Sequence, residues 1–151
     1  MKIIIGADHA GYGMKEALKQ GLILAGHDVK DVGAYSFNDG DDYPEFVKPL
    51  VEEVLATVDT QPIFCSGSGQ AEAMCANRYK GIRAAVYYHH DLGIARLSRE
   101  HNNANVLSIG ARFVSAEEAK EAIELWLTIP FDSNSRHARR LAKIDQLTSS
   151  T

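Results

Sequence analysis

The sequence predicts an α/β protein with one open, mostly parallel, doubly wound sheet. Five expected strands, among them the apolar runs Ile3 to Ala7 and Ile63 to Cys65, alternate with segments of helical periodicity between residues 3 and 110. The first run, Ile3 to Ala7, is continuously apolar and rich in β-branched residues. A continuous apolar run is typical of a parallel strand that is buried on both faces, and strands that alternate with helices build such sheets. A chain of 151 residues is long enough to bury a full core.

The first half of the chain predicts strands at its apolar runs and helices where apolar residues recur every three or four positions. Met14, Leu18 and Leu22 recur in this way, and Gly26 ends that helix. Pro44 suits the first turn of the next helix, where no backbone N–H is needed. The expected elements are strands at residues 3–7, 29–32 and 61–65, and helices at 14–25 and 43–55.

The second half predicts two more strands and four helices. Ser115 and Glu118 form a capping-box sequence at the start of a helix that includes Trp126, which we expect in the core. One of the three residues at 132–134 is expected to cap a last helix. The expected strands are 81–88 and 104–109, and the expected helices are 71–76, 91–99, 115–127 and one near the C-terminus. No repeat or linker divides the chain, so we expect one domain over residues 1–147 and a frayed tail at 148–151.

Composition and charge exclude several classes of protein. The net charge of -4 and the pI near 5.8 argue against general nucleic-acid binding, which needs a basic surface. No apolar run approaches the roughly 20 residues of a membrane span, and no signal-peptide pattern follows Met1. Cys65 and Cys75 form neither a disulfide framework nor a zinc spacing, and the six histidines lack a metal-ligand pattern. We therefore expect a cytoplasmic protein without a metal or another cofactor.

The segment from Ser66 to Glu72 is expected to be a tight turn between a strand and a helix. Its glycines allow close approach of backbone N–H groups to an anion. Gly67-Ser68-Gly69 resembles the start of a dinucleotide-binding fingerprint, but Glu72 stands where the third glycine would be, and a carboxylate disfavours a pyrophosphate. A turn without chemistry remains the alternative.

Polar residues follow three of the predicted strands. Asp8 and His9 follow the first, the 66–72 turn follows the third, and Arg112 follows the fifth. Because the carboxyl ends of parallel strands meet at one edge, we expect these groups to converge there. The alternative for Asp8 and His9 is a turn with an N-capping aspartate.

Cations gather near the expected start of the last helix. Arg136 and Arg140 stand one helical turn apart, with His137 and Arg139 between them. Cations are disfavoured at a helix N-terminus and repel one another, so the cluster suggests a site for an incoming anion. A solvated charged patch is the alternative, and His101-Asn102 could likewise be a surface loop.

Taken together, the motifs resemble the ribose-5-phosphate isomerase B / galactose-6-phosphate isomerase (RpiB/LacAB) family, in order from residue 3 to about 144. The resemblance implies a Rossmann-like three-layer α/β/α sandwich with a C-terminal helix. It also implies a homodimer, or a tetramer, with active sites between subunits, and metal-free conversion of an aldose phosphate into its ketose. The matching motifs are Gly6-Ala7-Asp8-His9-Ala10-Gly11, Asp42-Tyr43-Pro44, Gly67-Ser68-Gly69, Ala76-Asn77-Arg78, Gly81-Ile82-Arg83-Ala84, Glu100-His101-Asn102, Asn105-Val106-Leu107, Gly110-Ala111-Arg112 and Arg136-His137-Ala138-Arg139-Arg140.

By the same resemblance, catalytic roles fall on Glu72, His101 and Ser68. His101 would help open the sugar ring, with Ser68 nearby. One branch of the family has a cysteine base directly before the Gly-Ser/Thr-Gly turn, but this chain has Ser66 there and its Cys65 stands one residue too early. Another branch has a glutamate where this chain has Glu72. We therefore expect Glu72 to be the base, with Cys65 as the alternative.

The substrate-binding residues implied by the resemblance fall into three groups. The phosphate clamp would be His9, Arg112, Arg136 and Arg140. The sugar contacts would be Asp8, Tyr43 and Asn102. Backbone amides of Gly67, Gly69, Gln70 and Ala71 would cradle the enediolate oxygen, although Ala71 replaces a glycine usual in that branch.

Ribose 5-phosphate is the substrate that we expect, with ribulose 5-phosphate as product. Two alternatives remain open. One is an isomerase of the same family that acts on galactose 6-phosphate or a tetrose phosphate, with the 33–42 loop setting pocket length. The other is a non-catalytic sugar-phosphate sensor or nucleotide-binding module, which would not need Glu72, Ser68 and His101 together.

Overall fold

The structure, a computed structural model, describes residues 1–57 and 59–148. One sheet has the strand order β2-β1-β3-β5-β4, and every neighbouring pair is parallel. The strands are β1 (Lys2–Ala7), β2 (Asp28–Asp31), β3 (Thr60–Ser66), β4 (Ala84–Tyr87) and β5 (Val106–Gly110).

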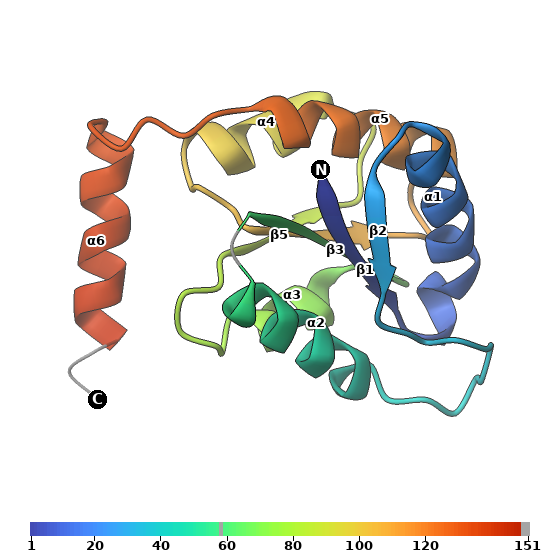
Figure 1. Cartoon of the computed structure of the whole chain (residues 1–151). Coiled ribbons are helices and arrows are strands. Elements are labelled where there is room, and N and C mark those ends of the chain that lie inside the picture. Colours follow the sequence, from blue (N-terminus) through green and yellow to red (C-terminus); the bar gives the residue numbers. More distant parts are fainter. Residues whose placement is uncertain (58, 149–151) are drawn as a thin grey trace.

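Helices cover both faces of this sheet (Figure 1). A short 3-10 turn, η1 (His9–Gly11), links β1 to the first helix. The helices are α1 (Tyr12–Leu24), α2 (Pro44–Ala56), α3 (Gln70–Ala76), α4 (Leu92–Glu100), α5 (Ala116–Thr128) and α6 (Arg136–Thr148). Helices α1, α4 and α5 lie on one face and α2 and α3 on the other, so the predicted three-layer, doubly wound fold is confirmed. No helix in the described part of the chain is long and apolar enough to cross a membrane.

Each face of the sheet packs into its own apolar cluster. Alternate residues of β3 separate, with Ile63 and Cys65 on the α1/α5 side and Phe64 on the α2 side. This is the buried-on-both-faces pattern that the continuous apolar runs predicted. Trp126 of α5 is fully buried, and its Nε1–H donates to Ser98 Oγ over 3.1 Å. The predicted core position of Trp126 is therefore confirmed.

The predicted start of the fourth strand differs most from the structure. The strand expected at 81–88 is β4, which begins only at Ala84, because Arg83 N–H donates to Asn105 Oδ1 (2.7 Å) and Ala84 N–H to Asn77 Oδ1 (2.7 Å). Gly81, with φ +88°, turns the chain before them. These side chains take the hydrogen bonds that a longer strand would have used.

The cap of α6 also differs from the prediction. Ser135 Oγ accepts from Ala138 N–H (3.3 Å), so Ser135 caps the helix instead of a residue at 132–134. Asp132 Oδ1 accepts from Asn134 N–H (2.9 Å) within the preceding turn. Thr148, placed by prediction in the frayed tail, is the last residue of α6, and 149–151 lie outside the described residues.

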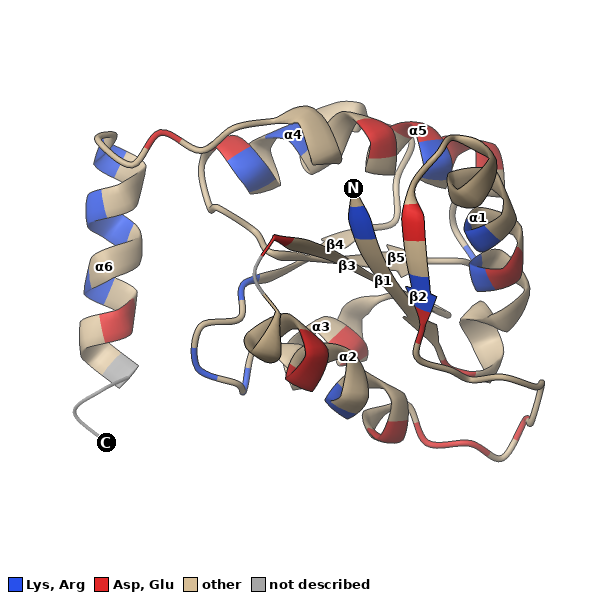
Figure 2. Ribbon diagram, viewed as in Figure 1, with Lys and Arg blue, Asp and Glu red and all other residues tan. Residues whose placement is uncertain are grey.

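Helix α6 extends away from the three layers (Figure 1). It meets the body at the 77–83 loop, with which it lines a pocket of ≈ 260 Å³. Ile144 and Leu147 are 55% and 77% exposed. Figure 2 shows its first three turns rich in Lys and Arg.

Gly11 is a position at which the fold leaves no space for a side chain. A Cβ there would lie 2.0 Å from the carbonyl oxygen of Cys65, so the chains of η1 and β3 would have to separate. We expect Gly11→Ala to lower the free energy of unfolding by about 3 kcal/mol or more. Gly13→Ala is the matched control: a Cβ there meets nothing within 4 Å, and a gain of about 0.5–1 kcal/mol is expected. Urea unfolding measures both, and equal stability of the two variants would contradict the prediction.

Candidate active site

The loops after β1, β3 and β5 meet at the carboxyl end of the sheet. Ala111 N–H donates to Ser66 O (2.7 Å) and Arg112 N–H to Gly67 O (3.1 Å). A Cβ on Gly110 would lie 2.8 Å from Ser68 O, so this close packing requires a glycine. The predicted convergence of the loops after the third and fifth strands is therefore confirmed.

Two serines hold the 67–69 turn in shape. Ser66 Oγ accepts from Gly69 N–H (3.0 Å), and Ser108 Oγ donates to Gly69 O (2.7 Å). Gly69 has φ +76°, and a Cβ there would lie 3.0 Å from Val86 Cγ1. Ser68 is half-buried, with its Oγ 3.4 Å from the N–H of Gln70. Sequence analysis missed Ser66 and Ser108 as supports of this turn, and the only signal for Ser108 was a hydroxyl inside an apolar strand.

Ala71 fits this turn without strain. It lies in the first turn of α3, which begins at the exposed Gln70, and it is not among the residues with positive φ. The glycine usual at this position in the related branch is therefore not needed for the backbone found here.

Glu72 is a buried carboxylate at the start of α3. The residue is 5% exposed, and its Oε2 is shielded from solvent without a hydrogen-bond partner among the described residues. Its charge also acts on Cys75, whose pKa is raised first by burial and then by Glu72. A buried carboxylate oxygen without a partner costs stability, so a functional role is one explanation for its presence here.

Cys65 occupies a very different environment. Its side chain is fully buried in the α1/α5 core cluster, beside Ile63 and Ile109. Burial raises the pKa of the Cys65 thiol far above its usual range, so the thiol stays protonated at neutral pH. The geometry therefore disfavours the alternative base.

The loop after β1 presents His9 and Asp8. His9 Nδ1 lies 2.6 Å from Asp41 Oδ1, which also accepts from the His9 backbone N–H (3.1 Å). The hydrogen bond to Asp41 raises the pKa of His9. Asp8 Oδ1 accepts from Gly11 N–H (3.0 Å), so Asp8 does cap η1, and burial raises its pKa. Sequence analysis missed Asp41, because its contact with His9 spans 32 residues.

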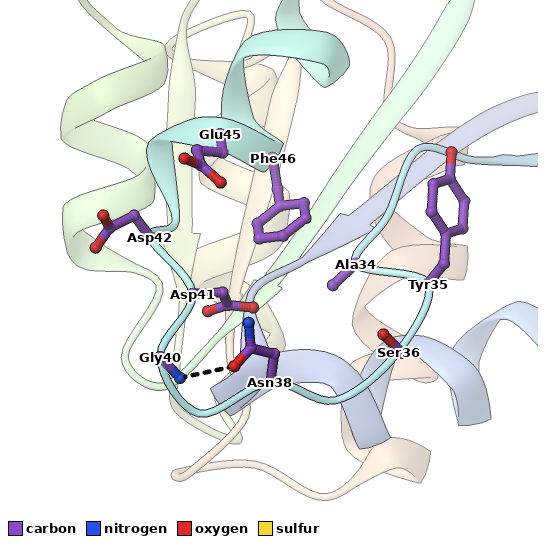
Figure 3. A pocket seen from close by; sticks show the side chains of 9 residues that line it. All are labelled: Ala34, Tyr35, Ser36, Asn38, Gly40, Asp41, Asp42, Glu45 and Phe46. Atoms are coloured by element: carbon purple, nitrogen blue, oxygen red, sulfur yellow. Dashed lines mark hydrogen bonds between the residues drawn. The ribbon is translucent and has the colours of Figure 1, made fainter.

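Asp41 also borders a pocket of ≈ 340 Å³ formed by the 34–46 segment. Figure 3 shows its carboxylate turned into this segment, between Asn38 and Ala34, whereas the carboxylate of Asp42 points away. Tyr43 does not line the pocket but packs, half-buried, against the α2-side core cluster.

Arg112 follows β5 and lies beside Gly67 in the turn after β3. The Cβ of a residue at Gly67 would lie 3.1 Å from Arg112 Cζ, so the guanidinium sits directly over the glycine. The positive charge of Arg112 acts on His9 and lowers the pKa of its imidazole, against the larger opposite effect of Asp41. Cations that approach one another at a loop of small residues form a site for an anion.

The remaining predicted residues form a second, separate group. The ring of His101, which ends α4, stacks on His137 of α6 with centroids 4.1 Å apart and planes 7° apart. Burial, followed by the charges of His101, Arg136 and Arg140, lowers the pKa of His137. Both arginines and Asn102 are exposed.

One chain does not bring this second group to the first. In Figure 1, α6 stands off one side of the body, whereas α1, which continues from η1 and His9, lies at the other. No group of three or more His, Cys, Asp or Glu side chains within residues 1–57 and 59–148 is placed to hold a metal ion.

The fold is an α/β sheet with polar and cationic side chains at the carboxyl ends of its strands, which is where open α/β sheets bind ligands. Residues 3–144 match the sequence model of a family described as Ribose/Galactose Isomerase, and the chain belongs to this family. The resemblance is thereby confirmed, and with it the expectation of an aldose-ketose isomerase.

Individual relatives are similar over nearly their whole length. A ribose 5-phosphate isomerase structure from Thermotoga maritima is 41% identical, covers 96% of this chain and 97% of its own, and has a TM-score of 0.89. The Mycoplasma genitalium ribose-5-phosphate isomerase B, solved with bound ribulose-5-phosphate, is 33% identical with a TM-score of 0.90, over 99% of this chain and 97% of its own. D-erythrulose-4-phosphate isomerase 2 of Mycolicibacterium smegmatis is 35% identical over 95% of each chain.

Proposed function

We propose that this chain interconverts ribose 5-phosphate and ribulose 5-phosphate without a metal ion, through an enediolate, with Glu72 as the base. The observation that carries the proposal is the buried Glu72 in the first turn of α3, whose Oε2 has no hydrogen-bond partner among residues 1–57 and 59–148. The match of the family over residues 3–144 supports treating residues 1–147 as one domain.

The chemistry needs a base that moves a proton between C1 and C2 while negative charge develops on the carbonyl oxygen. Glu72, which is 5% exposed in the first turn of α3, would be this base. Backbone N–H groups of the Gly67 to Glu72 segment would stabilise the enediolate oxygen, except those of Gly69 and Gln70, which donate to Ser66 Oγ and Ser68 Oγ. His101, with Ser68, would first help to open the sugar ring.

The phosphate lies far from the reacting carbons and can therefore be used to orient them. His9 and Arg112 form one half of its binding site, and Arg136 and Arg140 are expected to form the other. Because the two halves are separate in one chain, we propose that a second copy supplies the second half. This half consists of Arg136 and Arg140 from its α6, and of His101 and Asn102 from the end of its α4. The active unit would be a homodimer, or a tetramer built from dimers. Asp8 and Tyr43 would contact the sugar.

Two free cysteines and the absence of a membrane-spanning helix in the described residues are compatible with a cytoplasmic enzyme, which we propose. Cys65 is buried and Cys75 half-buried.

A substrate panel tests the proposal. We expect kcat/KM for ribose 5-phosphate to exceed that for erythrose 4-phosphate and galactose 6-phosphate by at least about tenfold, since a phosphate held at a fixed distance from C1 selects chain length. The tetrose is the main competitor, because the Mycolicibacterium smegmatis relative is named for a tetrulose phosphate. A preference for the tetrose or the hexose would reassign the substrate. Saturable binding with no ketose formed would indicate a sensor.

A further inference from the structure

Asp41 contacts both the imidazole ring and the backbone N–H of His9. Asp41 Oδ1 lies 2.6 Å from His9 Nδ1 and 3.1 Å from the His9 backbone nitrogen. An ionised carboxylate has no proton to donate, so Nδ1 must carry the hydrogen. Two donors of one residue on one oxygen leave the imidazole little freedom to rotate.

The ion pair between His9 and Asp41 is largely buried on the Asp41 side, so it differs from an exposed surface ion pair. The Asp41 side chain is 4% exposed, and its Oδ2 is shielded without a hydrogen-bond partner among the described residues. A carboxylate removed from water in this way is costly unless a cation lies beside it. The imidazolium form of His9 supplies that cation, whereas a neutral ring would leave the charge of Asp41 unbalanced.

The charges that face His9 come from three elements. Asp41 approaches from the loop before α2, Asp8 from the end of β1, and Arg112 from the loop after β5. The hydrogen bond to Asp41 has the largest effect and raises the pKa of His9. Burial and Arg112 lower it, and the charge of Asp8 raises it further. The balance favours the protonated ring.

Nε2, the second ring nitrogen of His9, is available to bind a ligand. His9 Nε2 makes no hydrogen bond within the described part of the chain. The ring of Phe37 meets the imidazole edge to face, with centroids 6.4 Å apart and planes at 82°. The His9 side chain remains 31% exposed, so one side of it is open.

We propose that Asp41 is a positioning residue: it keeps His9 protonated and holds its ring so that the Nε2–H points at the substrate phosphate beside Arg112. This inference rests on the proposed function of the site. It assigns Asp41 to phosphate affinity and its pH dependence, and not to the proton transfer itself.

Asp41→Asn is the test, because asparagine keeps the size and one acceptor oxygen but removes the charge. Asp39→Asn is the matched control, since Asp39 is an exposed carboxylate of the same loop. NMR titration of the His9 ring should give a pKa above 6.5 in the unchanged protein, and about one unit lower in Asp41→Asn only. The dissociation constant of inorganic phosphate near pH 7.5 should rise about fivefold to tenfold.

The pH dependence has a definite sign. His9 of Asp41→Asn loses its proton at lower pH than in the unchanged protein, so the affinity difference should grow between about pH 6 and pH 7.5 and vanish below about pH 5. KM for ribose 5-phosphate should rise by a similar factor while kcat stays within about twofold. A purely structural role of Asp41 would not produce this pH profile.

The titration and the phosphate measurement do not depend on turnover. If no sugar phosphate is isomerised, the proposed function fails, yet these two measurements still decide the role of Asp41. A His9 pKa at or below 6.5 in the unchanged protein, or equal phosphate affinities of Asp41→Asn and Asp39→Asn, would overturn the inference. In a His9→Gln background, Asp41→Asn should add less than about a twofold change, and a larger loss would also contradict it.

Discussion

Glu72→Gln is expected to lower kcat for isomerisation by about 10³-fold, while KM changes by less than about threefold. Glutamine has the size of glutamate but cannot accept the proton from C1 or C2. The amide also fits a site in which one carboxylate oxygen lacks a partner among the described residues, so the fold should not suffer. A coupled assay with ribose 5-phosphate measures turnover, and exchange of the substrate C–H for solvent deuterium measures proton transfer directly.

Cys65→Ser is the matched control for this experiment. Cys65 is buried in the core, and its high pKa keeps it a neutral thiol. A buried hydroxyl there should cost about 1–2 kcal/mol of stability, while kcat at 25 °C stays within about threefold for the folded protein. If Cys65→Ser abolishes exchange and Glu72→Gln leaves it intact, the assignment of the base is wrong.

The fold could be predicted because its signals are local. The three central strands, β1, β3 and β5, are buried on both faces, so each contains a short continuous apolar run in the sequence. The capping box at Ser115 and Glu118 is equally local, and both of its hydrogen bonds form. Strand ends then locate the site, because parallel strands place their carboxyl ends together.

Three of the supports that were not predicted depend on contacts between residues that are distant in the sequence. Ser108 supports Gly69 from 39 residues away, and Asp41 holds His9 from 32 residues away. The start of β4 is set in the same way, by Asn105 from 22 residues away. A hydroxyl, carboxylate or amide has many possible partners, and only the fold selects one. These three residues support site or strand geometry without belonging to a local pattern.

Glu72 and the α6 arginines occupy separate parts of one chain, and this separation has a chemical consequence. In the proposed site, His9 and Arg112 would hold the phosphate from one side, and the exposed Arg136 and Arg140 have cationic neighbours on their own helix. Positive charges within each pair, His9 with Arg112 and Arg136 with Arg140, repel one another. A phosphate bound between the two pairs would reduce the repulsion within each of them. A site shared between two copies would therefore couple assembly to substrate binding.

Mixed dimers test the shared site. Chains that carry Glu72→Gln, and chains that carry Arg136→Ala with Arg140→Ala, should each form nearly inactive dimers. A mixed dimer, isolated with two different affinity tags, would contain one site with both changes and one site with neither. Since each site would take Glu72 from one chain and the arginines from the other, we expect about half of the wild-type kcat per dimer.

The mixed dimer gives a result that no single substitution can give. If each site drew Glu72 and the arginines from the same chain, every site in the mixed dimer would be defective, and its activity would equal the average of the two parents. Sedimentation of the unchanged protein provides the second arm, because a fully active monomer would contradict a site between subunits. Recovery of activity on mixing requires that α6 of one copy reach the carboxyl end of the sheet of the other, where His9 follows β1, Glu72 lies in the first turn of α3, and Arg112 follows β5.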